Sequence, residues 1–131
     1  MMFVLDTNVV IHYLKGKGNV RDRLLATPPS TIAIPAIVVY EVEMGLARAA
    51  EPTQRQRQIG ALFGAVSILP FDEAAAKQAA QIGFALARAG LSIGPMDTLI
   101  AGTALAHHAT LVTHNTEEFQ RVSGLELVDW F

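Results

Sequence analysis

Short apolar segments alternate with longer helical patterns along the chain, and this alternation constrains the fold more than any other feature. Five short segments have the apolar character of buried strands: Phe3–Leu5, Thr31–Ile34, Ser67–Leu69, Thr110–Thr113 and Leu125–Val128. Strands that are separated by helices form parallel sheets with helices packed on both faces. The sequence therefore predicts an α/β domain with three layers, α/β/α, around a mainly parallel central sheet.

The segments between these strands carry helix start and stop signals. Asp72 is placed to cap an alanine-rich helix that Gly90 stops, and Pro95 stands in the first turn of the next helix. The predicted helices cover Val9–Leu14, Arg21–Ala26, Pro35–Ala50, Thr53–Ala65, Asp72–Arg88, Pro95–His107 and Thr116–Phe119.

Length and composition indicate one globular domain. The chain has 131 residues, of which 51% are hydrophobic and 17% charged, a composition that argues against disorder. Cysteine is absent from the sequence, which excludes a disulfide framework and a cysteine-ligated metal. No apolar run approaches the roughly 20 residues that span a bilayer. We therefore expect a soluble cytoplasmic protein that does not enter a membrane.

The formal net charge of −2 hides an asymmetry between the two halves. Residues 1–65 carry seven Lys or Arg against five Asp or Glu, whereas residues 66–131 carry three against seven. The basic residues of the first half are compatible with an edge that faces phosphate groups, and equally with ordinary solvated helix faces. They are Lys15, Lys17, Arg21, Arg23, Arg48, Arg55 and Arg57.

A polar cluster follows the first strand directly. Asp6, Thr7 and Asn8 come directly after an apolar run and before another apolar stretch. All three residue types bond local backbone N–H groups, so a turn or a helix N-cap explains them without any functional role.

A second polar cluster follows the strand near residue 112 in the same way, in the segment TLVTHNTEEF. It contains Thr113, Asn115, Glu117 and Glu118. The carboxyl ends of parallel strands meet at one edge of a sheet, and ligands of α/β proteins bind there. Two clusters delivered to that edge favour a functional site over two unrelated turns.

Two further segments place carboxylates among apolar residues. Glu41 has apolar neighbours at helical spacing, and an unpaired carboxylate in such surroundings is costly. Glu43 has similar neighbours, so the periodicity does not choose between the two. Asp97 lies in the first turn of its helix, where any Asp stabilises the helix dipole. That helix is rich in Ala and Gly, which allows close approach to the layer beneath it.

Four segments together resemble the signature segments of the PIN-domain ribonucleases, and more narrowly the VapC-type toxins of bacterial toxin–antitoxin pairs. They are LDTN, YEVEMG, PMDTLIAGTAL and LVTHNTEEF, and the ending GLELVDWF is similar to the terminal strand of such toxins. No single segment is specific, but the four in this order are. The resemblance covers essentially the whole chain and implies a single PIN domain over residues 1–131.

The resemblance implies that Asp6, Glu41 and Asp97 are the acidic residues of a metal site. Glu41 matches because it stands four residues before a glycine, as the acidic helix residue of the family does. The family completes the cluster with an Asp or Glu just before the Phe, or with an Asp where Asn115 stands, so Glu118 is the candidate for the fourth position and Asn115 is its alternative. The surrounding polar positions match Thr7, Asn8, Thr113 and Asn115. One departure is His114, where relatives often carry Arg or Asn; it affects an expected phosphate contact but not the metal site.

Crowded carboxylates repel one another unless a cation lies between them, and Mg²⁺ or Mn²⁺ prefers such oxygen ligands. The resemblance thus implies a metal-dependent endoribonuclease that hydrolyses phosphodiester bonds in structured RNA such as tRNA, as the toxin of a type II toxin–antitoxin system. It also implies a VapB-like antitoxin and a homodimer as partners.

Two alternatives stay open. A PIN-like domain can bind RNA or protein without cutting, although all the acidic candidates are present. A haloacid-dehalogenase-like phosphotransferase also begins with a strand and an Asp, but it needs a second Asp where Asn8 stands. The histidines are expected to be surface or packing residues, and Trp130 and Phe131 are expected to pack. The histidines are His12, His107, His108 and His114.

Overall fold

The computed structural model describes residues 1–49 and 53–131 and contains a five-stranded sheet in the order β3-β2-β1-β4-β5. Every pair of neighbouring strands is parallel, which confirms the predicted α/β class. The strands are β1 (Phe3–Leu5), β2 (Ile32–Pro35), β3 (Ser67–Leu69), β4 (Thr110–Val112) and β5 (Glu126–Val128). Each predicted strand is present, with its ends shifted by no more than a residue.

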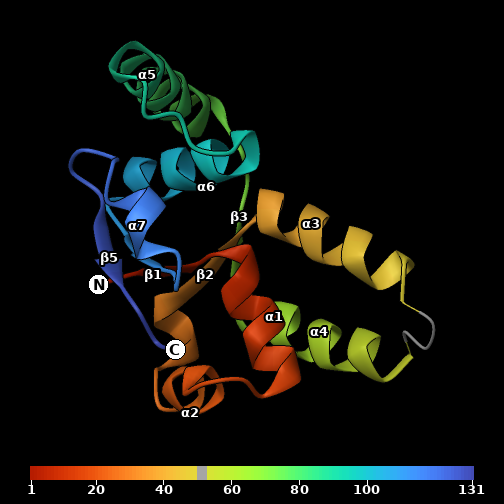
Figure 1. The fold of residues 1–131 in the computed structure, drawn as a ribbon. Coiled ribbons are helices and arrows are strands. Elements are labelled where there is room, and N and C mark those ends of the chain that lie inside the picture. The colour runs from red at the N-terminus through yellow and green to blue at the C-terminus, as the bar shows by residue number, and fades with distance from the viewer. Residues whose placement is uncertain (50–52) are drawn as a thin grey trace.

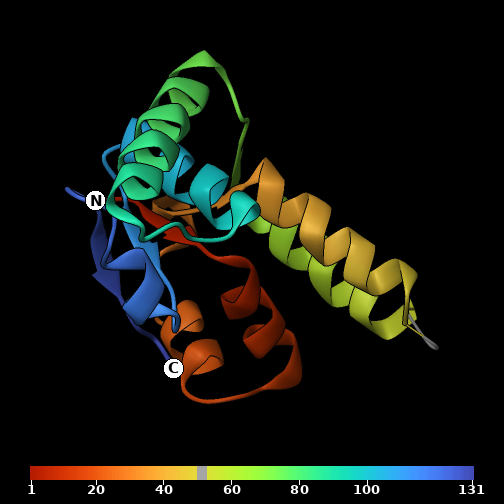
Figure 2. The same ribbon diagram turned by 45° about the horizontal axis from the view of Figure 1, so that its top comes forward.

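Helices cover both faces of the sheet (Figure 1). Helices α1, α2 and α4 lie on one side, and α5, α6 and α7 lie on the other, as right-handed crossovers in this strand order require. Figure 2 shows that α3 and α4 project from one edge of the domain. The helices are α1 (Thr7–Lys15), α2 (Val20–Leu25), α3 (Ala36–Ala47), α4 (Thr53–Ala65), α5 (Glu73–Ala89), α6 (Pro95–Ala106) and α7 (Thr116–Phe119), with a 3₁₀ turn over Pro29–Thr31.

The helix signals in the sequence act where they were expected. Asp72 caps α5 by accepting a hydrogen bond from the backbone N–H of Ala75 at 3.0 Å, and Gly90 ends that helix in the left-handed conformation. Helix α3 ends at Ala47, earlier than predicted, and Ala50 lies outside the described residues. None of the helices in the described ranges is both long and apolar enough to cross a membrane.

The core lies on both faces of the central strands. Val4 and Leu5 of β1 and Leu111 and Val112 of β4 have no exposed surface. Strands that are covered on both faces read as continuous apolar runs, which is why these segments show no alternation. Strands β1 and β4 are therefore held from both faces, and they fix the positions of the polar residues that follow them.

Helix α6 packs closely on α5 through small side chains. A Cβ atom added to Gly102 would lie 2.7 Å from the Cβ of Ala79, too close for any side chain. The close approach that the alanine-rich and glycine-rich sequence predicts is confirmed. It fixes the axis of α6, and with it the first turn that carries Asp97.

The order in which strands are added to the sheet changes direction at β1. From β1 the chain proceeds through β2 to β3 on one side, and it then returns to β4 on the other side of β1. Ligands of open parallel sheets bind at the carboxyl ends of the strands at such a switch point. The residues that follow β1 and β4 lie at this position.

Candidate active site

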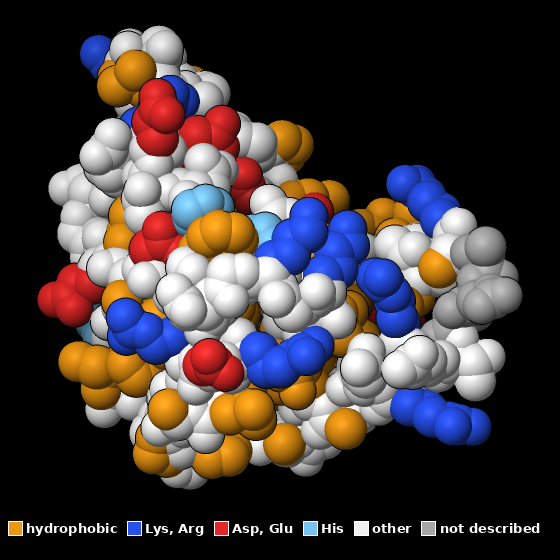
Figure 3. Space-filling model, turned by 60° about the horizontal axis from the view of Figure 1, so that its bottom comes forward, with side chains coloured by type: hydrophobic (Ala, Val, Ile, Leu, Met, Phe, Trp, Pro, Cys, Tyr) orange, Lys and Arg blue, Asp and Glu red, His pale blue; other side chains and the backbone are white. Residues whose placement is uncertain are grey.

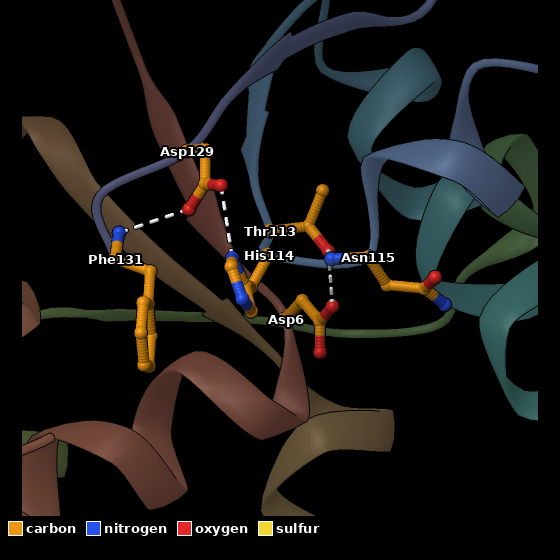
Figure 4. Close-up of polar contacts among 6 residues, drawn as sticks. All are labelled: Asp6, Thr113, His114, Asn115, Asp129 and Phe131. Carbon is orange, nitrogen blue, oxygen red and sulfur yellow. Dashed lines mark hydrogen bonds and ion pairs between the residues drawn. The ribbon is translucent and has the colours of Figure 1, made fainter. Parts of the chain in front are cut away.

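Asp6 lies at the centre of the site, immediately after β1. It is 3% exposed, and its backbone N–H donates to the carbonyl of Val112, which continues the pairing of β1 with β4. Its Oδ1 accepts a hydrogen bond from the backbone N–H of Asn8 at 2.9 Å, so Asp6 is the N-cap of α1. Its Oδ2 accepts from the hydroxyl of Thr113 at 2.6 Å (Figure 4). The capping interpretation is thus correct, and it coexists with a place in a polar cluster.

Burial raises the pKa of Asp6, and the negative charge of Glu41 raises it further. The hydrogen bonds from Thr113 and from the backbone of Asn8 act in the opposite direction, because they stabilise the ionised form. A positive charge placed beside Asp6 would therefore stabilise its ionised form. The side chain of Asn8 itself is exposed, so its contribution here is its backbone N–H.

Thr113 connects the ends of β1 and β4. It is fully buried, and its backbone N–H donates to the carbonyl of Val128 at 3.0 Å. Its Oγ1 accepts a hydrogen bond from the backbone N–H of Asn115 at 3.0 Å while donating to Asp6. The side chain of Asn115 in turn donates to Oε2 of Glu118 at 2.9 Å. A continuous set of hydrogen bonds therefore joins Asp6 to Glu118.

The structure distinguishes Glu41 from Glu43. Oε1 of Glu41 accepts a hydrogen bond from the hydroxyl of Thr7 at 2.6 Å, which links α3 to the start of α1. Glu41 is partly buried, whereas Glu43 is exposed. Only Glu41 belongs to the cluster around Asp6.

Asp97 faces the same cluster from the first turn of α6. The pKa of Asp97 is raised to about 6, and burial is the largest cause. The negative charges of three other carboxylates raise it as well: Asp6, Glu118 and Glu41. These residues come from four distant parts of the sequence, so the fold places every predicted acidic residue near enough to affect Asp97.

The donor set suits a divalent cation, since it consists of carboxylate oxygens whose mutual repulsion a cation relieves. Among residues 1–49 and 53–131, no three His, Cys, Asp or Glu side chains converge closely enough to hold an ion as they stand. The four carboxylates are thus near enough to repel one another without converging on one point. Their repulsion is the observation that fits a cation.

A group of aromatic rings beside the cluster was not anticipated from the sequence. The ring of His114 stacks on Phe131 with centroids 4.2 Å apart, and the ring of His12 stands edge-on to Phe131 at 4.9 Å. We call His12, His114 and Phe131 the aromatic cluster. Asp129 accepts from the backbone N–H of Phe131 at 2.9 Å and pairs with His114 Nδ1 at 2.9 Å. The contacts join distant segments, so no local pattern in the sequence indicates them. Trp130, as expected, packs in the core against Phe3.

Comparison with known proteins identifies the family. The PIN domain model matches residues 3–125, and the chain belongs to this family of nucleases. Within it, the chain belongs to the VapC ribonucleases. It is 35% identical to the tRNA(fMet)-specific endonuclease VapC of Shigella flexneri over 99% of this chain and 98% of the relative. It is 33% identical to Ribonuclease VapC2 of Rickettsia felis over 99% and 98%.

Solved structures support the same family assignment. The chain superimposes on VapBC2 from Rickettsia felis, bound to a DNA fragment from its promoter, with a TM-score of 0.92 and 31% identity over 100% of both chains. It superimposes on DNA-bound VapBC from Salmonella typhimurium with a TM-score of 0.92 and 32% identity over 100% of this chain and 99% of that one. The predicted fold class and family are both confirmed.

Proposed function

We propose that this chain, as a single PIN domain over residues 1–131, is a metal-dependent endoribonuclease and the toxin of a type II toxin–antitoxin pair. One observation carries the proposal. The charges of three carboxylates from separate segments reach Asp97 and help to raise its pKa to about 6. Carboxylates that repel one another in the protein alone are stabilised by a divalent cation, so their clustering is what a metal site requires.

Four residues would hold the metal, which we propose to be Mg²⁺ or Mn²⁺: Asp6, Glu41, Asp97 and Glu118. Hard cations of this kind bind oxygen ligands and keep several waters. When bound, such an ion lowers the pKa of a coordinated water and stabilises the charge that develops on the phosphate oxygens. The same charge makes an acidic cleft compatible with an RNA backbone.

The surrounding polar residues orient the carboxylates. Thr113 holds one oxygen of Asp6, and the backbone of Asn8 holds the other. Thr7 and Asn115 do the same for Glu41 and Glu118, each through one hydrogen bond. Partners of this kind fix the direction of a ligand oxygen and restrict its rotation, which improves metal affinity. We therefore propose that these four residues position the catalytic carboxylates.

We propose RNA as the substrate, and structured RNA such as tRNA in particular. The Shigella flexneri relative is named a tRNA(fMet)-specific endonuclease, which supports this class. The basic side chains of the first half provide contacts for the phosphates on either side of the cleavage point. Figure 3 shows a group of Lys and Arg side chains at the centre and right of this face, with others at its left edge. RNA of this class is found in the cytoplasm, where we propose that the enzyme acts.

A VapB-like antitoxin is the proposed partner, because the structural relatives from Rickettsia felis and Salmonella typhimurium are VapBC complexes. A groove beside Glu41 suits a segment of such a protein. Its lining is apolar along α1 and α3 and basic at two points: Ile11, Leu14, Val42, Leu46, Lys15 and Arg55. A segment with apolar side chains and an acidic group matches this lining. We also propose that the toxin forms a homodimer, as its resemblance to the family implies.

The test is cleavage of total RNA by the purified chain without antitoxin, in Mg²⁺, in Mn²⁺ and in EDTA. We expect cutting only with metal, and we expect Asp6→Asn, Asp97→Asn and Glu41→Gln each to abolish it. Glu43→Gln is the matched control, because it makes the same chemical change on the exposed side of α3 and should leave cutting intact. Metal binding without cutting of any RNA would favour a non-catalytic binding module instead.

A further inference from the structure

The aromatic cluster presents two parallel rings next to the catalytic carboxylates. The planes of His114 and Phe131 are inclined by only 19°. His12 stands at 76° to His114 and 69° to Phe131, so it supports the pair with its edge. Rings that stack in this way are parallel, so the ring face that the partner does not cover is a flat aromatic surface.

Hydrogen bonds hold this surface in place. The backbone N–H of Phe131 donates to Asp129, and its carbonyl accepts from the backbone N–H of Asn19 at 2.6 Å. Gly18 makes room for this contact, because a Cβ there would lie 2.5 Å from the carbonyl oxygen of Phe131. His114 is held through its Nδ1 by the same Asp129. The rings are thus fixed before any ligand arrives.

The rings are exposed although they are fixed. The side chain of His114 is 50% exposed with one face already covered, and Phe131 is 40% exposed. Trp130, the neighbouring aromatic residue, is only 5% exposed. An aromatic pair that served the core alone would be buried like Trp130. Much of the exposed surface of His114 therefore belongs to the ring face and edge that Phe131 does not cover.

The His114–Phe131 pair lies between the proposed metal site and two lysines. His114 directly follows Thr113, whose hydroxyl donates to Asp6, and Figure 4 shows the ring of His114 between Phe131 and Asp6. Lys17 directly precedes Gly18, which contacts Phe131, and the charges of Lys17 and Lys15 reach His12. Figure 3 shows histidine and apolar side chains near the middle of this face, with Lys and Arg side chains directly beside them.

We propose that the His114–Phe131 pair is a stacking platform for a base of the RNA substrate, beside the phosphate that is cut. The proposal rests on the proposed ribonuclease function. A base that stacks on His114 places its own phosphate toward Asp6 and the neighbouring phosphates toward Lys15 and Lys17. Stacking on an aromatic face tolerates any base, so the platform increases affinity and fixes the register of the strand without reading its sequence.

The test measures binding of two probes to the Asp97→Asn protein in Mg²⁺: an eight-nucleotide oligoadenylate and an abasic ribose-phosphate strand of the same length and charge. Both carry a fluorescent label for anisotropy. We expect the oligoadenylate to bind about tenfold more tightly, as one stacked base provides. Phe131→Leu and His114→Asn should each remove most of this difference and leave the abasic strand unaffected. Phe131→Tyr keeps the ring and should keep the difference.

Other outcomes overturn the proposal. If the Leu and Asn variants weaken both probes equally, the rings act by holding the Thr113–Asn115 turn, and not by stacking. If the variants change neither probe, or if the two probes bind equally to the parent protein, no base binds there. Unfolding midpoints show whether a variant has lost its fold. Because Phe131→Leu and His114→Asn test the same stack, the proposal remains testable if one of them does not fold. Cleavage of total RNA by the wild-type chain tests the ribonuclease function separately. If the wild-type chain does not cut RNA but base-dependent binding is intact, only the ribonuclease function is refuted.

Discussion

The repulsion around Asp97 predicts that the metal-free protein gains stability when this charge is removed. In an unfolded chain the carboxyl has a pKa of 3.8, and in the folded protein the value is about 6. Well below the unfolded pKa of 3.8 the group is protonated in both states and costs nothing. As the pH rises from about 4 to about 6, the folded state retains a proton that the unfolded state has lost, so stability decreases. Above about pH 7 the penalty is complete.

The magnitude follows from the size of the shift. A difference of about two pKa units corresponds to about 3 kcal/mol for a fully buried group. Asp97 is only partly buried, and solvent screening reduces the effect to about 1 kcal/mol, or about 4 °C in the midpoint of thermal unfolding. Asp97→Asn should therefore raise the midpoint at pH 8 in EDTA by this amount, and should have little effect near pH 4.

The assay is thermal unfolding followed by circular dichroism at both pH values, with and without Mg²⁺. The metal should raise the midpoint of the wild-type protein at pH 8 and should raise that of Asp97→Asn much less, because the variant lacks a ligand. Glu43→Gln serves as the control and should show no pH-dependent difference. A destabilisation by Asp97→Asn of the same size at both pH values would refute the electrostatic reasoning.

Three further changes test the packing and the hydrogen bonds. Thr113→Val removes the hydroxyl that bonds Asp6 and should cost about 1–3 kcal/mol in urea unfolding, whereas Thr113→Ser should cost much less; equal losses would contradict this role. Gly45→Ala should stabilise α3 by about 0.5–1 kcal/mol, since nothing lies within 4 Å of the new methyl group, and should weaken antitoxin capture because it narrows the groove beside Glu41; unchanged capture would place the antitoxin elsewhere. Gly102→Ala should destabilise by more than about 2 kcal/mol in thermal unfolding, because its Cβ would meet Ala79 at 2.7 Å, and a neutral result would show that α5 can move away.

The local sequence predicted the elements of this fold well. Strands β1 and β4 are apolar runs with polar ends, and Asp72 and Gly90 mark the two ends of α5 as expected. These signals act between residues a few positions apart, so a reader of the sequence can recognise them. The acidic candidates came instead from the resemblance of four segments, in their order along the chain, to the family. Their metal-binding role stays a prediction.

The different surroundings of Glu41 and Glu43 depend on contacts across the fold. Both have apolar neighbours at helical spacing, and the structure separates them by the hydrogen bond from Thr7, 34 residues away, and by the partial burial of Glu41. The elevated pKa of Asp97 has the same origin, because it depends on burial and on charges that the sheet brings to one edge.

The sequence by itself thus determined the alternation of strands and helices and their caps, and its resemblance to the family indicated the acidic candidates. Only the tertiary structure decided which side chains meet. The stack of His114 on Phe131 and its support by His12 depend on three segments that converge where β4, α1 and the last residues lie together. Such contacts are specified by the packing of the whole chain, and the packing of distant segments leaves no periodic signal in the residues that make the contact.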